Sequence, residues 1–120
     1  MAVYRGRSTW SLAARNVLVD MYAQYAYTPL MSPTFDPAKS AANMRKHGVP
    51  LSDGDGVLYD PLALTVEDMS IDSEQRFVTI GVNVFGALMV VVFSHRHDDV
   101  RFISVRRATP KERRIYEKGI

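Results

Sequence analysis

The residues with the most distinctive chemistry are three arginines near the end of the chain. Arg101, Arg106 and Arg107 lie in or beside the apolar segment 100–107, whose composition predicts a β-strand. Arginine on a sheet face needs a carboxylate partner or a phosphate-shaped ligand, because its planar fork of donors is otherwise unmet. The sequence therefore predicts either a phosphate-binding strand or salt bridges to the acidic middle segment of the chain.

The charges are segregated along the chain, although the formal net charge is only +2. Residues 48–75 hold seven Asp and Glu and no Lys or Arg, whereas residues 101–120 hold seven Lys and Arg against two Glu. A basic last strand and helix suits phosphate groups, and it equally suits a solvated helix face. The absence of cysteine excludes thiol chemistry, and His47, His95 and His97 have no metal-ligand spacing.

The first 34 residues form an N-terminal segment that we assign to a region separate from the domain that carries these arginines and histidines. Residues 9–27 predict an amphipathic helix, and Pro29 and Pro33 end it in a linker. No segment predicts a membrane span or a signal peptide, so we expect a cytoplasmic protein. We place an N-terminal extension at 1–34 and the domain at 35–120. Our hypothesis is that translation starts at Met31; the alternative is a genuine helix that docks on the domain or a partner.

The domain is expected to begin with a helix over residues 37–46. Asp36 suits its N-cap, Pro37 its first turn and Gly48 its C-terminal stop. Three alanines give this helix a small apolar face, and four polar residues share the other side. The alanines are Ala38, Ala41 and Ala42, and the polar residues are Lys39, Asn43, Lys46 and His47.

Strands dominate the rest of the domain. Residues 50–61 predict a loop or a poorly formed helix, 62–66 a short strand and 67–74 an acidic loop. Strands follow at 76–84, where the valines at 78, 82 and 84 share a face with Ile80, at 87–93 and at 100–107. In a regular last strand, Arg101 and Arg107 share one face and Arg106 lies on the other.

A final helix begins at Thr109 with a capping box to Glu112 and ends near Gly119. The order of elements predicts an α+β fold, in which an antiparallel sheet of about four strands is flanked by helices.

Residues 35–118 resemble the BrnT family, the toxins of bacterial type II toxin–antitoxin systems. The resemblance rests on short blocks that are specific together and weak singly. They are Phe35-Asp36-Pro37-Ala38-Lys39, Asn43-Met44-Arg45-Lys46-His47-Gly48-Val49, Asp60-Pro61, Glu74-Gln75-Arg76-Phe77, Val90-Val91-Val92 and residues 101–117, with Ile103-Ser104 and Arg106. The chain departs from the family at residues 50–56, which replace a helix, and at the turn 96–99.

The resemblance implies a fold similar to RelE-type ribonucleases and an RNA-cleaving activity that arrests translation and growth. It also implies a partner, a BrnA-type antitoxin whose ribbon-helix-helix part binds DNA. Toxin and antitoxin would form a hetero-oligomer that reaches operator DNA only through the antitoxin. No cofactor, metal or membrane is implied.

RNA cleavage without a metal needs a base, an acid and cations on the phosphate. The candidate catalytic residues are Lys46, His47, Arg76, Arg106, Glu112 and Tyr116, and the candidate phosphate-binding residues are Lys39, Arg101, Arg107, Lys111 and Arg113. His47 suits acid–base work, and it equally suits a helix C-terminus. Glu112 and Tyr116 are expected to orient a base or an arginine. Their alternatives are the capping box and a core or interface position.

Two other functions stay open from the sequence. One is a non-toxic, toxin-like binding module that acts with an antitoxin in operon autoregulation. The other is a nucleic-acid-binding protein that performs no chemistry.

Overall fold

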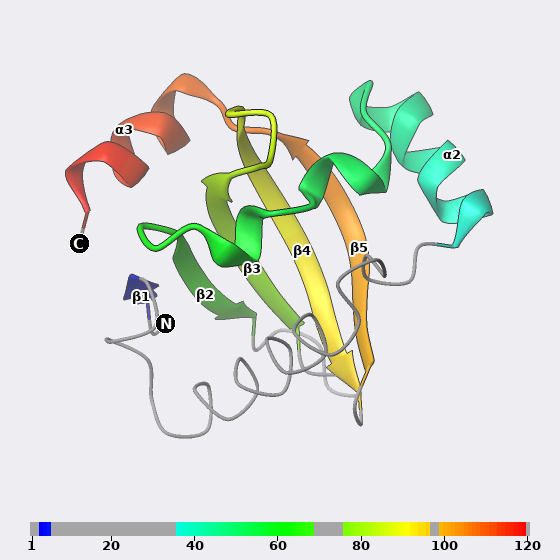
Figure 1. The fold of residues 1–120 in the computed structure, drawn as a ribbon, viewed down its shortest axis with the longest axis horizontal. Helices are drawn as coiled ribbons and strands as arrows, with labels where there is room; N and C mark the ends of the chain where they lie inside the picture. Colours follow the sequence, from blue (N-terminus) through cyan, green and yellow to red (C-terminus); the bar gives the residue numbers. More distant parts are fainter. Residues whose placement is uncertain (1–2, 6–35, 69–75, 97–98, 120) are drawn as a thin grey trace.

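The computed structural model describes residues 3–5, 36–68, 76–96 and 99–119. The predicted helix over 9–27, most of the acidic loop and His97 lie outside these residues. The sheet contains β1 (Val3–Arg5), β2 (Leu64–Asp68), β3 (Arg76–Val82), β4 (Leu88–Arg96) and β5 (Asp99–Arg107), adjacent in chain order (Figure 1). Every neighbouring pair is antiparallel. The α+β class is therefore confirmed, and the short β1 adds a fifth strand to the four expected.

One face of the sheet carries the main core. Along β3, Phe77, Thr79 and Gly81 are buried and alternate with half-buried residues. Phe77 pairs with Phe93 of β4, and their rings stack with centroids 5.3 Å apart. We call the side of the sheet that carries Phe77, Thr79 and Gly81 the core face. The predicted apolar face of Val78, Ile80 and Val82 does exist, but it is the half-buried opposite side, because the aromatic side chains define the denser layer.

A β-bulge in β5 changes which arginines share a face. Phe93 pairs with Phe102 and Val92 pairs with Ser104, so Ile103 is an extra residue. An extra residue reverses the alternation of side chains along the strand. Val105 therefore joins Phe102 on the core face. The expectation that Arg101 and Arg107 share a face is wrong.

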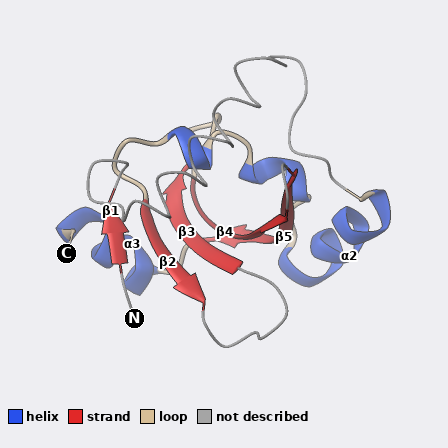
Figure 2. Ribbon diagram, turned by 90° about the horizontal axis from the view of Figure 1, so that it is seen from below, coloured by secondary structure: helices blue, strands red, loops and turns tan. Residues whose placement is uncertain are grey.

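The segment between residues 50 and 61 covers the core face. It forms two 3-10 turns, η1 (Leu51–Gly54) and η2 (Val57–Tyr59), which agrees with the poorly formed helix and not with a loop. Leu51 and Val57 are fully buried and join the core. The backbone of η1 approaches β5 closely at Gly54, where an added Cβ would lie 2.9 Å from both Phe102 Cε2 and Val105 Cγ2. Figure 2 shows these helical turns lying along one side of the sheet.

Helix α2 (Pro37–His47) protects the outer edge of β5. The predicted caps are confirmed: Asp36 accepts from the Ala38 N–H, and Gly48 has φ 77°. Asn43 is buried; its Oδ1 accepts from the Val105 N–H at 3.1 Å, and its Nδ2 donates to the Val105 carbonyl at 2.7 Å. These bonds satisfy backbone groups that an edge strand otherwise leaves unpaired. In Figure 1, α2 lies beside β5.

The inward side of α2 is polar, contrary to the expected division of its faces. Ser40 and His47 are half-buried on either side of Asn43, whereas the alanine face at 38, 41 and 42 is exposed. Hydrogen bonding decides this orientation, because a methyl group cannot pair with the edge of β5 as the Asn43 amide does.

Helix α3 (Pro110–Lys118) closes the chain. Its capping box is confirmed, since the Glu112 N–H donates to Thr109 Oγ1 at 3.2 Å and the Thr109 N–H donates to Glu112 Oε1 at 2.9 Å. The helix ends at Gly119, as the sequence predicts.

Candidate functional site

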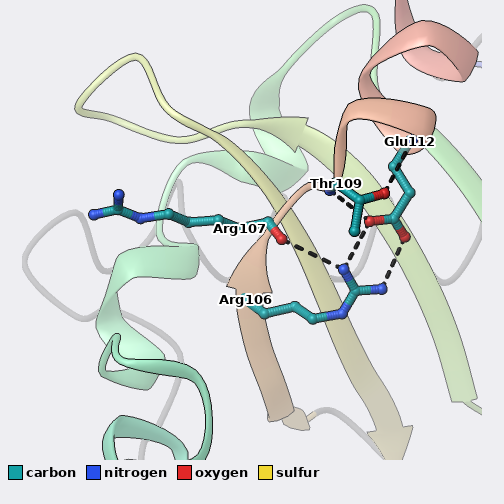
Figure 3. A network of polar contacts seen from close by, with 4 residues as sticks. All are labelled: Arg106, Arg107, Thr109 and Glu112. Atoms are coloured by element: carbon teal, nitrogen blue, oxygen red, sulfur yellow. Dashed lines mark hydrogen bonds and ion pairs between the residues drawn. The ribbon is translucent and has the colours of Figure 1, made fainter.

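A paired arginine and carboxylate connect β5 to α3. Arg106 Nη1 donates to Glu112 Oε1 at 2.7 Å, and Nη2 donates to Oε2 at 2.8 Å, a bidentate geometry (Figure 3). Because Glu112 Oε1 also accepts from the Thr109 N–H, the helix cap fixes the carboxylate that holds the arginine. Glu112 therefore fills both roles that the sequence left open for it, the capping box and the orientation of an arginine.

The pair has a clear effect on protonation. The hydrogen bonds from Arg106, more than those from Thr109, lower the pKa of Glu112 to about 2. The same hydrogen bond raises the pKa of Arg106 above its ordinary value. Glu112 is thus ionised at neutral pH and has no proton to give. Its part is to position Arg106.

Three arginines share the half-buried side of the sheet. Arg106 pairs across strands with Val90, whereas Arg76 and Arg101 flank Ser94 in one row. Paired residues project to the same side, so the bulge sets Arg76, Arg101 and Arg106 on what we call the arginine face. The Ser94 row and the Val90 row are four residues apart on β4, about 13 Å. This separation is too large for side chains of the two rows to contact a single phosphate group.

Arg107 extends in the opposite direction from Arg106 (Figure 3). It pairs with Met89 on the core-face side and is exposed at the end of β5. The sequence argument that only one of these two arginines joins a given site therefore agrees with the register.

Tyr116 connects α3 to the turn that precedes β2. Its hydroxyl donates to Asp60 Oδ2 at 2.6 Å, and the same oxygen accepts from the Val82 N–H at 2.9 Å. Asp60 Oδ1 accepts from the Leu62 N–H. The structure thus gives Tyr116 a contact that orients α3. Sequence reasoning passed over Asp60 as a partner, although its pairing with Pro61 was a visible signal.

The remaining candidates do not join the arginine face. Lys39 and Lys46 are exposed on α2 and His47 is half-buried there, at the edge of β5. Within the described part of the chain, the side chains of Lys46 and His47 form no hydrogen bond or ion pair. Lys111 and Arg113 are exposed on α3. The predicted catalytic set is therefore divided among α2, the arginine face and α3.

The alternative of salt bridges to the acidic middle segment does not apply to Arg106. Its carboxylate comes from α3, six residues further along the chain. Arg106 pairs with Glu112 because the two residues are close in sequence: the capped helix α3 directly follows β5 and places Glu112 within reach.

Two features are absent from the described ranges. They contain no group of three or more His, Asp or Glu side chains arranged to hold a metal ion. None of their helices is both long and apolar enough to cross a membrane.

Comparison with known families decides the identity. The family model described as the ribonuclease toxin, BrnT, of type II toxin–antitoxin systems matches residues 35–112. The chain belongs to the BrnT family. The match includes α2, the sheet from β2 to β5 and the Arg106–Glu112 pair. No curated protein matches the chain. BrnT membership makes it a ribonuclease toxin whose counterpart is a protein antitoxin.

Proposed function

We propose that this BrnT protein is a metal-independent endoribonuclease that inhibits translation and growth by cutting RNA bound on the arginine face. The observation that carries the proposal is the β5 bulge, which gathers Arg76, Arg101 and Arg106 on one side. Guanidinium groups bind phosphate well and stabilise the charge that develops on it during cleavage.

Arg106 is the proposed contact to the scissile phosphate. Glu112 engages the end-on fork of its guanidinium, and the Nε–H edge makes no hydrogen bond to any described residue. An arginine held on one edge is pre-organised to donate from the other. The negative charge of Glu112 offsets the positive charge of Arg106, so the pair attracts RNA only weakly from a distance. Its fixed geometry therefore supports a catalytic contact more than long-range attraction of RNA.

We assign proton transfer to His47. It lies one helical turn after Asn43, which bonds β5 immediately before Arg106. An RNA strand that crosses the β5 edge would meet both groups. In this scheme a base takes the 2′-OH proton as that oxygen attacks phosphorus, the P–O5′ bond breaks, and an acid protonates the leaving oxygen. Lys46 is proposed as a further phosphate contact.

The first test is RNA cleavage by purified full-length protein in excess chelator. We expect wild type to cleave, and Arg106→Ala, Arg76→Ala and His47→Gln to lose at least about 100-fold in rate while their circular dichroism is unchanged. Cleavage that stops with chelator would overturn metal independence. An active Arg106→Ala would overturn the phosphate contact, and an active His47→Gln would leave that histidine as a helix-terminal residue only.

Arg101 and Arg107 provide a matched pair for the arginine face. Both are exposed arginines of β5, on opposite sides of the sheet. We expect Arg101→Ala to weaken RNA binding several-fold more than Arg107→Ala at low salt, with a smaller salt dependence than wild type. Equal losses would contradict the assignment of RNA to one face.

The proposed partner is a BrnA-type antitoxin with a ribbon-helix-helix part that binds operator DNA. Only the toxin–antitoxin complex, and not the toxin alone, is expected to shift operator DNA in a gel. Growth arrest on expression of this chain is expected to disappear when the antitoxin is co-expressed.

A further inference from the structure

The turn between β3 and β4 holds apolar side chains out in solvent. Phe85 is 78% exposed and Val84 is 62% exposed. Asn83 fixes this turn, because its Oδ1 accepts from the Phe85 and Ala87 N–H groups at 3.0 and 2.9 Å. Its Nδ2 donates to the Asp53 carbonyl at 2.8 Å, which joins the turn to η1. Two large apolar side chains held in water by a well-bonded turn are typical of an interaction surface.

A pocket of about 490 Å³ opens beside this turn. Its lining includes Tyr59, Asp60, Val82 and Val84. Tyr59 is itself 41% exposed. An aromatic and an acidic residue that line one open pocket suit the apolar stem and cationic head of a lysine or arginine.

Two aspartates of the segment 50–61 contact the turn through their backbone carbonyls. The Asp55 carbonyl accepts from the Val84 N–H at 3.1 Å, and the Asp53 carbonyl accepts from Asn83. Both carboxylates are half-buried, and neither forms an ion pair with a described residue. Residues 48–75 contain no Lys or Arg to offset them. The charges of Asp53 and Asp55 favour a basic partner at this turn, while the basic helix α3 meets the pocket at Asp60 through Tyr116.

We propose that the turn surface, made of Val84, Phe85, Tyr59 and the adjoining pocket, docks an amphipathic basic segment of the protein antitoxin. Apolar side chains of that segment cover Phe85 and Val84, and a cationic side chain enters the pocket beside Asp60. The choice of partner rests on the proposed function, since a type II toxin is held by a protein. The surface shares no residue with the arginine face, so mutation can separate antitoxin binding from RNA cleavage.

The experiment measures, by titration calorimetry, the affinity of full-length toxin variants for a purified BrnA-type antitoxin that binds the wild-type chain. Phe85→Asp is the test variant. Met44→Asp is the matched control, since Met44 is also an exposed large apolar residue, 47% exposed, and lies on α2. We expect Phe85→Asp to weaken binding at least about tenfold and Met44→Asp to leave it within about twofold. An Asp53→Asn/Asp55→Asn double variant is expected to weaken binding more at low salt than at high salt.

Each result bears on the docking surface directly. Unchanged antitoxin affinity in Phe85→Asp, or an equal loss in Met44→Asp, overturns it. If the Phe85→Asp variant, without antitoxin, cleaves RNA more weakly but keeps full antitoxin affinity, the docking proposal is also wrong. The turn surface would then contact RNA instead. If wild type binds antitoxin through Phe85 but cleaves no RNA, the docking surface stands and the proposed catalytic function fails.

Discussion

At the residue scale, the carboxylate of Glu112 takes part in two interactions at once, the cap of α3 and the pair with Arg106. It completes the cap of α3 through Thr109 and holds both terminal nitrogens of Arg106 (Figure 3). The side chains are 35% exposed for Arg106 and 21% for Glu112, so solvent screens part of the attraction. The pair therefore contributes modestly to stability and strongly to the direction in which Arg106 points.

Replacing Glu112 by Gln tests the charge while keeping an acceptor for the helix cap. We expect the free energy of unfolding to fall by about 1 kcal/mol at pH 7. In the folded protein the pKa of Glu112 is lowered from 4.5 to about 2. The stabilisation is therefore complete above the unfolded pKa and disappears as the pH falls through the folded value.

Denaturant titrations of both proteins between pH 7 and pH 2 measure this effect. The gap between wild type and Glu112→Gln should close as the medium becomes acidic. Glu117→Gln, at an exposed position of the same helix, is the control and should show no comparable gap. A gap that stays constant with pH would contradict an ionic origin.

At the scale of elements, Asn43 fastens α2 to the sheet. Its amide makes three hydrogen bonds: two with the Val105 backbone and one, at 2.8 Å, with the Val49 carbonyl. All three lie in a buried environment, where an unpaired backbone group is costly. Ser40 of the same helix accepts from the Leu51 N–H at 3.1 Å. The helix that carries Lys46 and His47 is thus positioned by polar side chains and not by an apolar stripe.

Asn43→Ala should lower the free energy of unfolding by about 3 kcal/mol, because it leaves buried N–H and C=O groups of β5 unsatisfied. Chemical denaturation followed by far-ultraviolet circular dichroism measures this loss. Met44→Ala, at the adjacent exposed position, should change stability by less than about 0.5 kcal/mol. Similar losses for both would show that packing of α2, and not the Asn43 amide, holds the helix.

At the scale of the whole molecule, the core depends on how closely the 3-10 turns approach the sheet. Gly54 lies where a side chain would meet Phe102, Val105 and Val91 within about 3 Å. Gly54→Ala should therefore cost about 1–3 kcal/mol through overpacking. Gly48 provides the comparison: its φ is 77°, but an added Cβ would meet nothing within 4 Å. Thermal unfolding of Gly48→Ala should show a loss of about 1 kcal/mol from backbone strain alone.

The two glycines separate two causes of instability. Enlarging Gly54 should be partly rescued by a smaller neighbour, as in Gly54→Ala/Val105→Ala, whereas no neighbour can rescue Gly48. If Gly54→Ala is as stable as wild type, the close approach of η1 to β5 is wrong.

The sequence by itself determined the elements whose signals are local. Asp36 and Gly48 mark the ends of α2, Thr109 and Glu112 mark the start of α3, and the spacing of apolar residues marks four strands. Caps and alternation depend on neighbours a few residues apart, so they can be read without knowing the fold. The family resemblance also came from the sequence, and the family match confirms it.

Tertiary structure alone decided which residues share a surface. Nothing in the sequence marks Ile103 as a bulge, yet that one extra residue moves Arg101 to the side of Arg106. Nothing local marks Asn43 as buried, because its partner Val105 lies 62 residues later. Nothing local marks Leu51, Val57 and Leu58 as core either, because they pack against distant strands of the sheet. The candidate residues were visible in the sequence. The separation of the α2 candidates from the arginine face follows from long-range pairing, in which register and edge hydrogen bonding outweigh local pattern.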